Sequence, residues 1–241
     1  MLINERQQRI LELLSENPAL NVKSLANLLH VSEPTIRRDF TELADRHLLT
    51  KFYGGAKLVH GAADSEIPFM LRENERSQTK VEMGKKAAEH IADGMVIMLD
   101  GSTSAYYIVP YLQRFKDLIV VTSGAKTAVA LAERNIRTYS TGGQMITHSF
   151  SLVGEEAESF IRKINANICF FSCRGLTLDG IMTDVSVAEV NLRRVMFSHS
   201  KKKVLLCDSS KFGKTYFYNQ GRLDEVDELV SDKPFVLENK P

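Results

Sequence analysis

Two consecutive arginines, Arg37 and Arg38, are the side chains whose type and spacing indicate the most specific chemistry in this 241-residue sequence. A guanidinium group can bind phosphate oxygens or the edge of a guanine base. On a helix, Arg38 and Thr41 point away from the neighbouring apolar positions, with Arg37 and Thr35 on the flanks. Such a face predicts insertion into a DNA major groove. The alternative is that the two arginines are part of an ordinary solvated helix surface.

The helix that would carry these arginines has a defined start and a narrow apolar edge. Ser32 stands where an N-cap belongs, and Pro34 suits the first turn because its missing N–H costs nothing there. Ile36, Phe40 and Leu43 recur at the i, i+4 and i+7 positions of one face. The sequence therefore predicts a short helix with one buried edge and a polar outer face that includes Pro34.

Two further helices are predicted before this one. Residues 4–16 carry Ile10, Leu13 and Leu14 on one face, and residues 22–29 have an apolar face of leucines. Residues 30–32 then supply the short turn of a helix-turn-helix.

A β-hairpin is predicted directly after the third helix. Residues 48–53 form its first strand, Gly54-Gly55 the tight turn, and residues 56–59 the return strand. Lys51 and Lys57 would meet phosphates beside the groove. Three helices followed by a hairpin define a winged helix-turn-helix.

Residues 6–58 also resemble the DNA-binding domain of the DeoR family of bacterial transcription regulators. The matching motifs are Arg6-x-x-Arg9-Ile10-Leu11, Leu25-Ala26, Val31-Ser32, Thr35-Ile36-Arg37-Arg38-Asp39 and Gly54-Gly55-Ala56. The sequence departs from the family pattern at Phe40, where leucine is usual, and at Lys51, where arginine is common. The resemblance implies operator DNA as a partner.

The overall composition is that of an ordinary globular protein, with 44% hydrophobic and 25% charged residues and a net charge of +1. Residues 1–58 hold eight lysines and arginines against seven aspartates and glutamates. Affinity for DNA must therefore come from the placement of the positive charges and from a second copy of the domain. We expect a homodimer or homotetramer.

The remaining compositional features favour a cytoplasmic protein without a metal site. Cys169, Cys173 and Cys207 lie in or beside apolar runs, so we expect buried, reduced thiols. We find no amino-terminal signal region and no apolar run long enough to cross a membrane. No Gly-x-Gly-x-x-Gly or Walker pattern is present, so we expect no dinucleotide or ATP cofactor.

A linker, residues 59–76, is predicted between the residue 1–58 domain and a second domain, residues 77–241. Residues 60–76 lose apolar periodicity, which is typical of a hinge. A helix is predicted from about 78 to 91. Its packed side would hold Val81, Gly84, Ala87, Ala88 and Ile91, and its outer side Lys80, Lys85 and Lys86.

Apolar strands alternate with helices in the rest of the chain, which predicts an α/β domain with a mainly parallel sheet covered on both faces. The predicted strands are residues 96–99, 118–121, 137–140, 168–171, 204–207 and 226–230. The predicted helices lie near residues 105–114, 125–134, 154–162 and 185–198.

Ligands of parallel sheets bind at the carboxyl ends of the strands, so polar residues at those ends are candidate ligand-binding residues. The first choice for a phosphate is the loop of Asp100, Gly101, Ser102, Thr103 and Ser104, and the second is Thr122, Ser123 and Gly124. The other candidates are Gly142 and Gly143 for close backbone approach, Arg174 and Lys211 as cations, and Asp100, Asp184 and Glu189 for sugar hydroxyls. Each loop alone has a structural alternative, because the following helix needs a cap.

The second domain resembles the effector-sensing domain of the DeoR family. The matching places are Asp100 to Thr103, Thr122-Ser123, Gly142-Gly143, Gly154, Gly175, Asp179-Gly180 and Asp208 to Gly213. The departures are Gly101-Ser102 where Ser-Gly is frequent, Ser123 for asparagine, Asn167 for aspartate, and Ser172 near a usual glycine. The resemblance implies a fold like that of sugar-phosphate isomerases, and binding of a phosphorylated sugar without turnover.

The two resemblances imply a repressor of a carbohydrate-utilisation operon that a phosphorylated sugar releases from DNA. A sugar-phosphate isomerase or lyase carrying a DNA-binding head is the first alternative, with Asp184, Glu189 and Lys211 as candidate base and electrophile. The second alternative is an interaction scaffold that binds no ligand.

Overall fold

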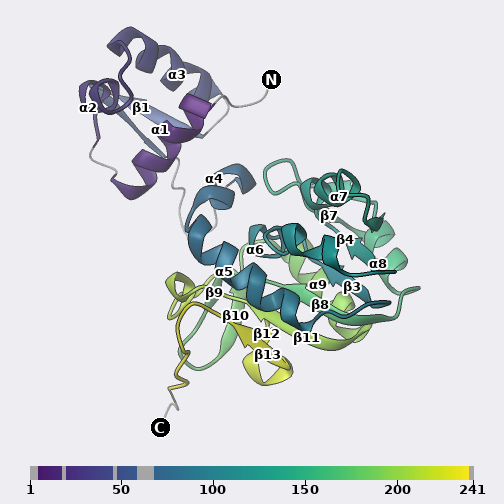
Figure 1. Ribbon diagram of the computed structural model, residues 1–241. Helices are drawn as coiled ribbons and strands as arrows, with labels where there is room; N and C mark the ends of the chain where they lie inside the picture. Colours follow the sequence, from purple (N-terminus) through teal and green to yellow (C-terminus); the bar gives the residue numbers. More distant parts are fainter. Residues whose placement is uncertain (1–4, 18–19, 46–47, 59–67, 239–241) are drawn as a thin grey trace. The chain divides into compact units, whose positions relative to one another are not determined.

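The computed structural model describes residues 5–17, 20–45, 48–58 and 68–238. The chain divides into two compact units, Met1–Glu75 and Arg76–Pro241 (Figure 1). Residues 59–67 of the expected linker lie outside the described residues. Its later part is not free of structure, because Phe69–Asn74 form helix α4 and the Phe69 side chain is buried.

The first unit contains the expected winged helix-turn-helix. Its elements are α1 (Glu5–Glu16), α2 (Val22–Leu28), α3 (Glu33–Asp45), β1 (Leu49–Phe52) and β2 (Gly55–Leu58). One hydrophobic cluster joins them, and the predicted Ile10, Ile36, Phe40 and Leu43 are all buried in it. The expected cap is present, because the Ser32 hydroxyl accepts a hydrogen bond from the Thr35 N–H at 3.4 Å.

The hairpin turn lies one residue earlier than the sequence suggests. Phe52 pairs with Gly55 across the two strands, so the two-residue turn is Tyr53-Gly54 and Gly55 already belongs to β2. Gly54 has φ of +85°, the left-handed conformation that such a turn requires and that glycine adopts without strain. The last residue of the expected return strand, Val59, is outside the described residues.

The second unit is built on a six-stranded sheet in the order β13-β11-β8-β3-β4-β5. Its strands are β3 (Val96–Leu99), β4 (Ile119–Thr122), β5 (Arg137–Ser140), β8 (Ala166–Phe171), β11 (Ser200–Leu206) and β13 (Glu228–Val230). Every neighbouring pair is parallel, as the alternation of strands and helices predicts.

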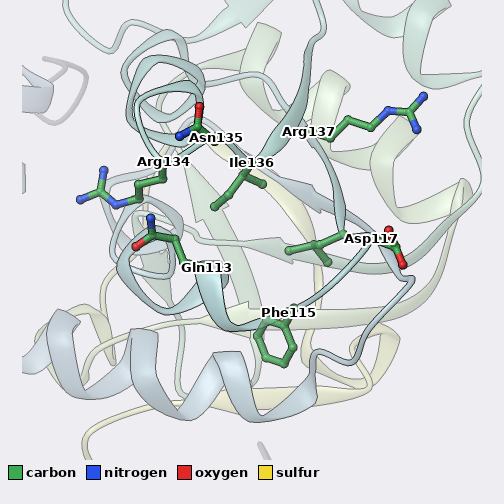
Figure 2. A pocket seen from close by; sticks show the side chains of 8 residues that line it. Gln113, Phe115, Asp117, Arg134, Asn135, Ile136 and Arg137 are labelled. Carbon is green, nitrogen blue, oxygen red and sulfur yellow. The ribbon is translucent and has the colours of Figure 1, made fainter.

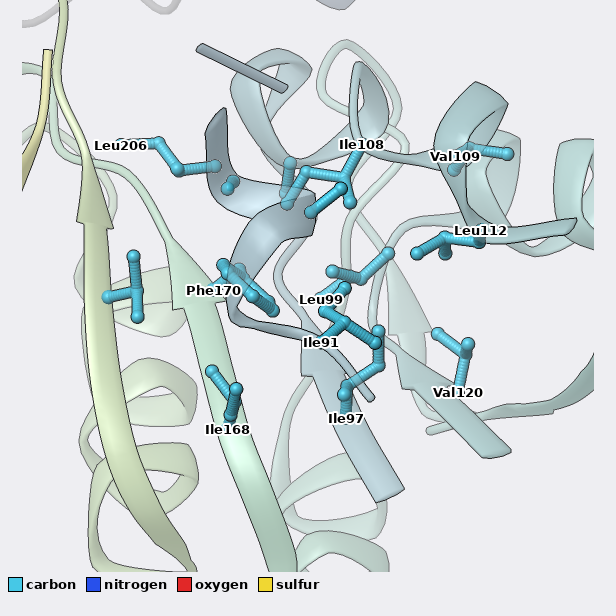
Figure 3. Packing of buried hydrophobic residues seen from close by; sticks show 14 of the residues in the cluster. Ile91, Ile97, Leu99, Ile108, Val109, Leu112, Val120, Ile168, Phe170 and Leu206 are labelled. Atoms are coloured by element: carbon cyan, nitrogen blue, oxygen red, sulfur yellow. The ribbon is translucent and has the colours of Figure 1, made fainter. Parts of the chain in front are cut away.

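Alternate strand residues enter two different hydrophobic clusters, one on each face of the sheet. Ile97, Leu99 and Phe170 pack with α5 (Ser77–Ala87), α6 (Thr103–Tyr106) and α7 (Ala125–Ala132) (Figure 3). Met98 and Phe171 face the other way, toward α8 (Glu155–Ile161) and α9 (Val187–Ser198). This arrangement explains why the strands are apolar at nearly every position.

Two helix predictions need correction. The helix expected to run to residue 91 ends at Ala87 and continues as a short 3-10 turn, η1 (Ala88–His90). Its buried face holds Lys80, whereas Val81 is 42% exposed, so both assignments were wrong. Lys80, Gly84 and Ala87 share one helical face, and Lys80 is buried there with only 4% of its surface exposed.

The helix expected near 105–114 is instead split. After α6 the chain forms a 3-10 helix, η2 (Val109–Arg114), which contains Pro110. Proline cannot donate the hydrogen bond that would continue an α-helix.

Short antiparallel elements supplement the main sheet and were not predicted. They are β6 (Gln144–Met145) paired with β7 (Leu152–Val153), and β9 (Gly175–Leu176), β10 (Ile181–Asp184) and β12 (Tyr218–Arg222) in the order β12-β10-β9. Two more 3-10 turns are η3 (Ser209–Lys211) and η4 (Leu223–Glu225). Strands of two residues are too short for an alternating pattern to identify. No described helix is long and apolar enough to span a membrane.

Candidate DNA-binding surface and candidate ligand site

The polar face of α3 is open to solvent. The side chains of Arg37 and Arg38 are 59% and 84% exposed, and they contact Glu33 and Glu42 at 3.4 and 3.5 Å. Exposed pairs of this kind are weak, so the arginines can exchange these carboxylates for phosphate at little cost. Ser32, Pro34 and Thr41 are exposed and Thr35 is half-buried. The structure therefore places the predicted α3 residues on or beside one accessible face.

Hydrogen bonds connect the hairpin to α3. Lys51 Nζ donates to Thr41 Oγ1 at 3.1 Å, and the same hydroxyl donates to the Arg37 carbonyl at 3.0 Å. The Val22 N–H donates to the Gly54 carbonyl at 3.1 Å, which fixes the hairpin to the start of α2. Lys57 is exposed on β2. The helix and both hairpin lysines thus have a defined spacing before any DNA is bound.

Tyr53 is a candidate DNA contact that the sequence did not single out. It occupies the hairpin turn and is fully exposed, and the adjacent Phe52 is 53% exposed. An aromatic side chain at the tip of a hairpin has no packing role in the monomer. Its position in the turn is the signal that would have identified it.

Asp39, the acidic residue after the arginine pair, is structural. Its buried carboxylate accepts from Arg6 Nε at 2.7 Å and Nη2 at 3.1 Å, and from Gln7 Nε2 at 3.4 Å. The hydrogen bond to Asp39 raises the pKa of Arg6. This contact fixes α3 against α1, so the orientation of the exposed arginines depends on a buried acid on the opposite side of the same helix.

In the second unit, Asp100 connects the loops that follow β3 and β8. Its Oδ1 accepts from the Ser102 N–H at 3.0 Å, and its Oδ2 accepts from the Ser172 N–H at 3.1 Å. Oδ2 also accepts from Arg193 Nε at 2.8 Å. The carboxylate is fully buried, and its two oxygens accept from these three protein donors.

Arg193, on α9, brings together the three predicted carboxylates. Besides Asp100, it donates from Nη1 to Asp184 Oδ2 at 2.6 Å, and its Nη2 lies 3.7 Å from Glu189 Oε2. Burial disfavours its charge, but these carboxylates more than compensate and raise the pKa of Arg193. Burial likewise opposes ionisation of Asp184, yet Arg193 and Arg174 hold the pKa of Asp184 below its usual value.

A narrow crevice opens beside this ion-pair cluster, with no space inside it for a water-sized molecule. It is lined by Asp100, Gly101, Ser123, Ser151, Glu189, Leu192 and Arg193. Four of these residues, Asp100, Gly101, Ser123 and Glu189, are among the predicted ligand-binding residues. Pockets that hold small molecules are much larger, so this crevice could hold a ligand only in a wider form.

Three buried hydroxyl groups at the same strand ends have no hydrogen-bond partner among the described residues: Ser104 Oγ, Thr127 Oγ1 and Ser151 Oγ. Two of them face glycines. A Cβ added at Gly101 would lie 2.1 Å from Ser151 Oγ, and one at Gly124 would lie 2.8 Å from Thr127 Oγ1. An unsatisfied buried hydroxyl costs about 1–3 kcal/mol, so these three groups are candidates for contact with a polar ligand. Only Ser104 was predicted.

Other predicted loop residues have local structural roles. The Ser102 hydroxyl caps α6 by accepting from the Ala105 N–H at 3.1 Å, and Thr122 Oγ1 accepts from the Gly124 N–H at 3.0 Å. Thr103 is the buried first residue of α6. The alternative given above, that these loop residues cap or begin the following helix, therefore agrees with the geometry of these side chains.

The glycine pair after β5 does not line the crevice. Gly142 and Gly143 have φ of +69° and +93°, and a Cβ at Gly143 would lie 2.5 Å from the Val153 carbonyl oxygen. These glycines therefore permit a tight turn and close approach to β7 rather than contact with a ligand in the crevice.

The two predicted cations flank the carboxylate cluster. Lys211 Nζ donates to Ser172 Oγ at 2.8 Å, and Ser172 in turn contacts Asp100. Arg174 is half-buried, and its charge helps to lower the pKa of Asp184.

The three cysteines are free and buried, as expected, with Cys173 and Cys207 Sγ atoms 3.8 Å apart. Within the described ranges, no group of three or more His, Cys, Asp or Glu residues could hold a metal ion.

A larger groove of about 350 Å³ lies at the amino ends of β4 and β5 (Figure 2). It is lined by Gln113, Phe115, Asp117, Leu118, Arg134, Asn135, Ile136 and Arg137. Its arginines bond to protein groups: Arg134 donates to the Ala130 carbonyl at 2.9 Å, and Arg137 to the Tyr139 hydroxyl at 3.0 Å. None of the predicted ligand-binding residues lies there.

Two family models match separate parts of the chain. Residues 6–62 match the DeoR-like helix-turn-helix domain, and residues 75–233 match the DeoR C-terminal sensor domain. The chain belongs to the DeoR family of transcription regulators. It is therefore a transcription regulator and not an enzyme.

Relatives match along nearly the whole chain. The HTH-type transcriptional regulator YulB of Bacillus subtilis is 34% identical over 96% of this chain and 90% of its own length. The L-fucose operon activator of Escherichia coli is 30% identical, covering 95% of this chain and 94% of that protein. The glycerol-3-phosphate regulon repressor of Escherichia coli is 27% identical, covering 95% and 91%.

Comparison with solved structures gives matches at low sequence identity. The translation initiation factor eIF-2B of Pyrococcus horikoshii aligns with 96% of this chain and 88% of its own, with a TM-score of 0.50 and 14% identity. Ribose 5-phosphate isomerase A of Methanocaldococcus jannaschii aligns with 56% of this chain and 54% of its own, with a TM-score of 0.43 and 13% identity.

Proposed function

We propose that this regulator represses a carbohydrate-utilisation operon and that a phosphorylated sugar, bound at the strand ends of the second unit, releases it from operator DNA. The observation that carries the proposal is the group of three unpartnered buried hydroxyls beside the ends of β3 and β4, within a sensor domain. Two relatives are named for glycerol 3-phosphate and L-fucose, a phosphorylated metabolite and a sugar.

We assign DNA contact to the exposed face of α3 and to the hairpin. Arg37 and Arg38 bind bases or phosphates, and Ser32, Pro34, Thr35 and Thr41 border them. Lys51, Lys57 and Tyr53 contact the backbone beside the groove. One such domain has few cations, so a homodimer or homotetramer presents at least two of them to paired half-sites. Lower operator affinity of Tyr53→Ala with unchanged folding would support the tip contact, and equal affinity would reject it.

We place the phosphate of the ligand near the Gly101–Ser104 loop and the Ser123-Gly124 loop, where the hydroxyls of Ser104, Thr127 and Ser151 lack partners. The rest of the ligand then extends toward Glu189, Arg174 and Lys211. Asp100 and Asp184 are already bonded to Arg193, so their part is to hold that arginine and the loops in position. This division leaves the Gly142-Gly143 loop out of the proposed site and gives the buried carboxylates Asp100 and Asp184 an indirect role.

Release of DNA requires that the ligand bind one arrangement of the oligomer more tightly than the other. Widening of the narrow crevice is the local change that supplies this difference. We propose that the segment 59–76 passes the change to the DNA-binding domain, residues 1–58, in a protein that acts in the cytoplasm.

The test is a melting-temperature screen with sugar phosphates and their unphosphorylated sugars, followed by DNA binding with each compound that stabilises the protein. Stabilisation by a phosphorylated sugar alone, together with weaker operator binding, supports the proposal. If no compound stabilises the protein and operator binding never changes, the ligand-free scaffold replaces it. Ser151→Ala should reduce the stabilisation at a given ligand concentration, whereas Ser198→Ala, at an exposed serine outside the crevice, should leave it unchanged.

A further inference from the structure

Arg76, the first residue of the second unit, is held in an unusual conformation. It stands at the N-cap of α5 with φ of +52°, the left-handed region that residues other than glycine seldom adopt. Its side chain contacts two carboxylates: Nη2 lies 2.8 Å from Asp232 Oδ2, and Nε lies 3.5 Å from Asp208 Oδ1. These contacts fix the point at which the chain enters the second unit.

Asp208 connects Arg76 with the candidate ligand site. Its Oδ1 faces Arg76 and accepts from the Ser210 N–H at 3.1 Å, whereas its Oδ2 lies 3.8 Å from Lys211 Nζ. Burial opposes its ionisation, but Lys211, Ser210 and Arg76 hold the pKa of Asp208 below its usual value. One ionised carboxylate is therefore shared between two cations.

Lys211 carries the connection into the crevice. Its Nζ donates to Ser172 Oγ at 2.8 Å, and the Ser172 N–H donates to Asp100, which lines the crevice with Arg193. A second carboxylate holds the other side, since Asp232 accepts from the Ser209 N–H at 2.6 Å and from its hydroxyl at 2.8 Å. Both carboxylates that hold Arg76 thus also hold η3, the turn that carries Lys211.

We propose that Arg76 is a positioning residue through which occupation of the strand-end site reaches the segment leading to the DNA-binding domain. A ligand oxygen that accepts a hydrogen bond from Lys211 weakens the attraction between the Lys211 ammonium group and the Asp208 carboxylate. Asp208 then interacts more strongly with Arg76, and the start of α5 becomes more firmly held. This inference rests on the proposed function for its trigger, a polar ligand at Lys211, but the network itself can be tested without one.

The variant Lys211→Met removes the competing charge and stands in for the bound ligand. The readout is hydrogen exchange of the Lys80 amide, which donates to the Arg76 carbonyl at 3.1 Å. We expect Lys211→Met to slow this exchange by about two- to fivefold, the range that a partly exposed ion pair can supply, and Arg76→Gln to accelerate it. Arg162→Gln is the matched control, because Arg162 also contacts two carboxylates, Glu155 and Glu158, and should leave the exchange unchanged.

The double variants separate coupling from a purely structural role of Arg76. In an Asp208→Asn background, whose amide oxygen can still accept from Ser210, Lys211→Met should have no further effect on Lys80 exchange. Lys211→Met should likewise have no further effect on Lys80 exchange in an Arg76→Gln background. This second background replaces the first if Asp208→Asn does not fold. An effect of Lys211→Met that persists in either background, or no effect in the parent protein, overturns the inference. The sugar-phosphate screen decides the proposed function separately.

Discussion

Asp100 and Arg193, 93 positions apart in the chain, form a buried ion pair with 2.8 Å between Oδ2 and Nε. The pair joins the loop after β3 to helix α9 and forms one wall of the crevice. Because Arg193 also bonds to Asp184, one cation balances two buried carboxylates. The shape of the candidate ligand site therefore depends on a residue that need not touch the ligand.

Removing this cation should destabilise the second unit strongly. Arg193→Met leaves Asp100 and Asp184 buried without a counter-charge, and breaking a buried pair in this way costs about 3–5 kcal/mol. Urea unfolding measures the loss. The adjacent Arg194→Met is the control, because Arg194 is exposed and its guanidinium donates to the Gln220 carbonyl at 2.8 Å rather than to a buried carboxylate. Equal effects of the two substitutions would contradict the role given to Arg193.

The stability of the second unit should fall in acid. Arg193 and Arg174 hold the pKa of Asp184 below its usual value against the effect of burial, so the folded state binds this proton less readily than the unfolded chain. The stabilisation is then present above about pH 4, the pKa of an unfolded aspartate, and is lost as the pH falls through the lower folded value.

Urea unfolding of the parent and of Asp184→Asn over this range tests the sign. We expect the variant to be less stable near neutral pH and to lose less stability on acidification. Asp224→Asn, at an exposed carboxylate, should follow the parent. A parent and an Asp184→Asn variant with the same acid dependence would show that Asp184 is not the linked group.

Removing one of the unpartnered hydroxyls should raise the stability of the ligand-free protein and lower its affinity for the ligand. Ser151→Ala removes a buried group that has no partner, so the ligand-free protein should gain up to about 1 kcal/mol, while the affinity for a stabilising sugar phosphate falls about tenfold. Ser186→Ala provides the contrast, because its hydroxyl caps α9 by accepting from the Glu189 N–H, and its loss should destabilise by about 1 kcal/mol. Destabilisation by Ser151→Ala would mean that its hydroxyl is already satisfied.

The arginine face of α3 should govern operator binding. Arg38→Ala should cost about 1–3 kcal/mol of operator affinity, since the side chain is 84% exposed and its loss should not disturb folding. If Arg38 binds a phosphate, the dependence of affinity on salt should weaken by about one ion; if it reads a base, specificity should relax instead. Arg162→Ala, in the second unit, is the charge-matched control. Unchanged affinity of Arg38→Ala at physiological salt would exclude this face as the reader.

Local patterns were sufficient to predict the winged helix-turn-helix and the strands of the parallel sheet. The apolar stripe of α3, its Ser32 cap and the apolar run of β3 are properties of neighbouring residues. The exposed face of α3 followed from helix geometry alone. The prediction was wrong at Lys80, which combines a long apolar stem with a charged end. Its charge suggested an outer position, but the residue is buried.

The candidate ligand site was predicted only in part, because its organisation depends on long-range contacts. The loops at the strand ends follow from parallel topology, which brought Asp100 and Ser123 to one crevice, whereas Glu189 reaches it from helix α9. Arg193 gave one neglected signal: it occupies an apolar position on α9 between the buried Val190 and Phe197. Ser151 gave none, because only the short β6–β7 hairpin and the bridge between Gly124 and Ser151 bring it to the site.

Nuclease protection of the DNA upstream of the protein's own gene, with and without sugar phosphates, tests the central claim most directly. We expect two protected half-sites in the absence of ligand and loss of protection with a phosphorylated sugar that also raises the melting temperature. Ser151→Ala should protect the same DNA and require more of that sugar for release. Full-length protein that protects no segment, or protection that no sugar phosphate alters, would contradict the account.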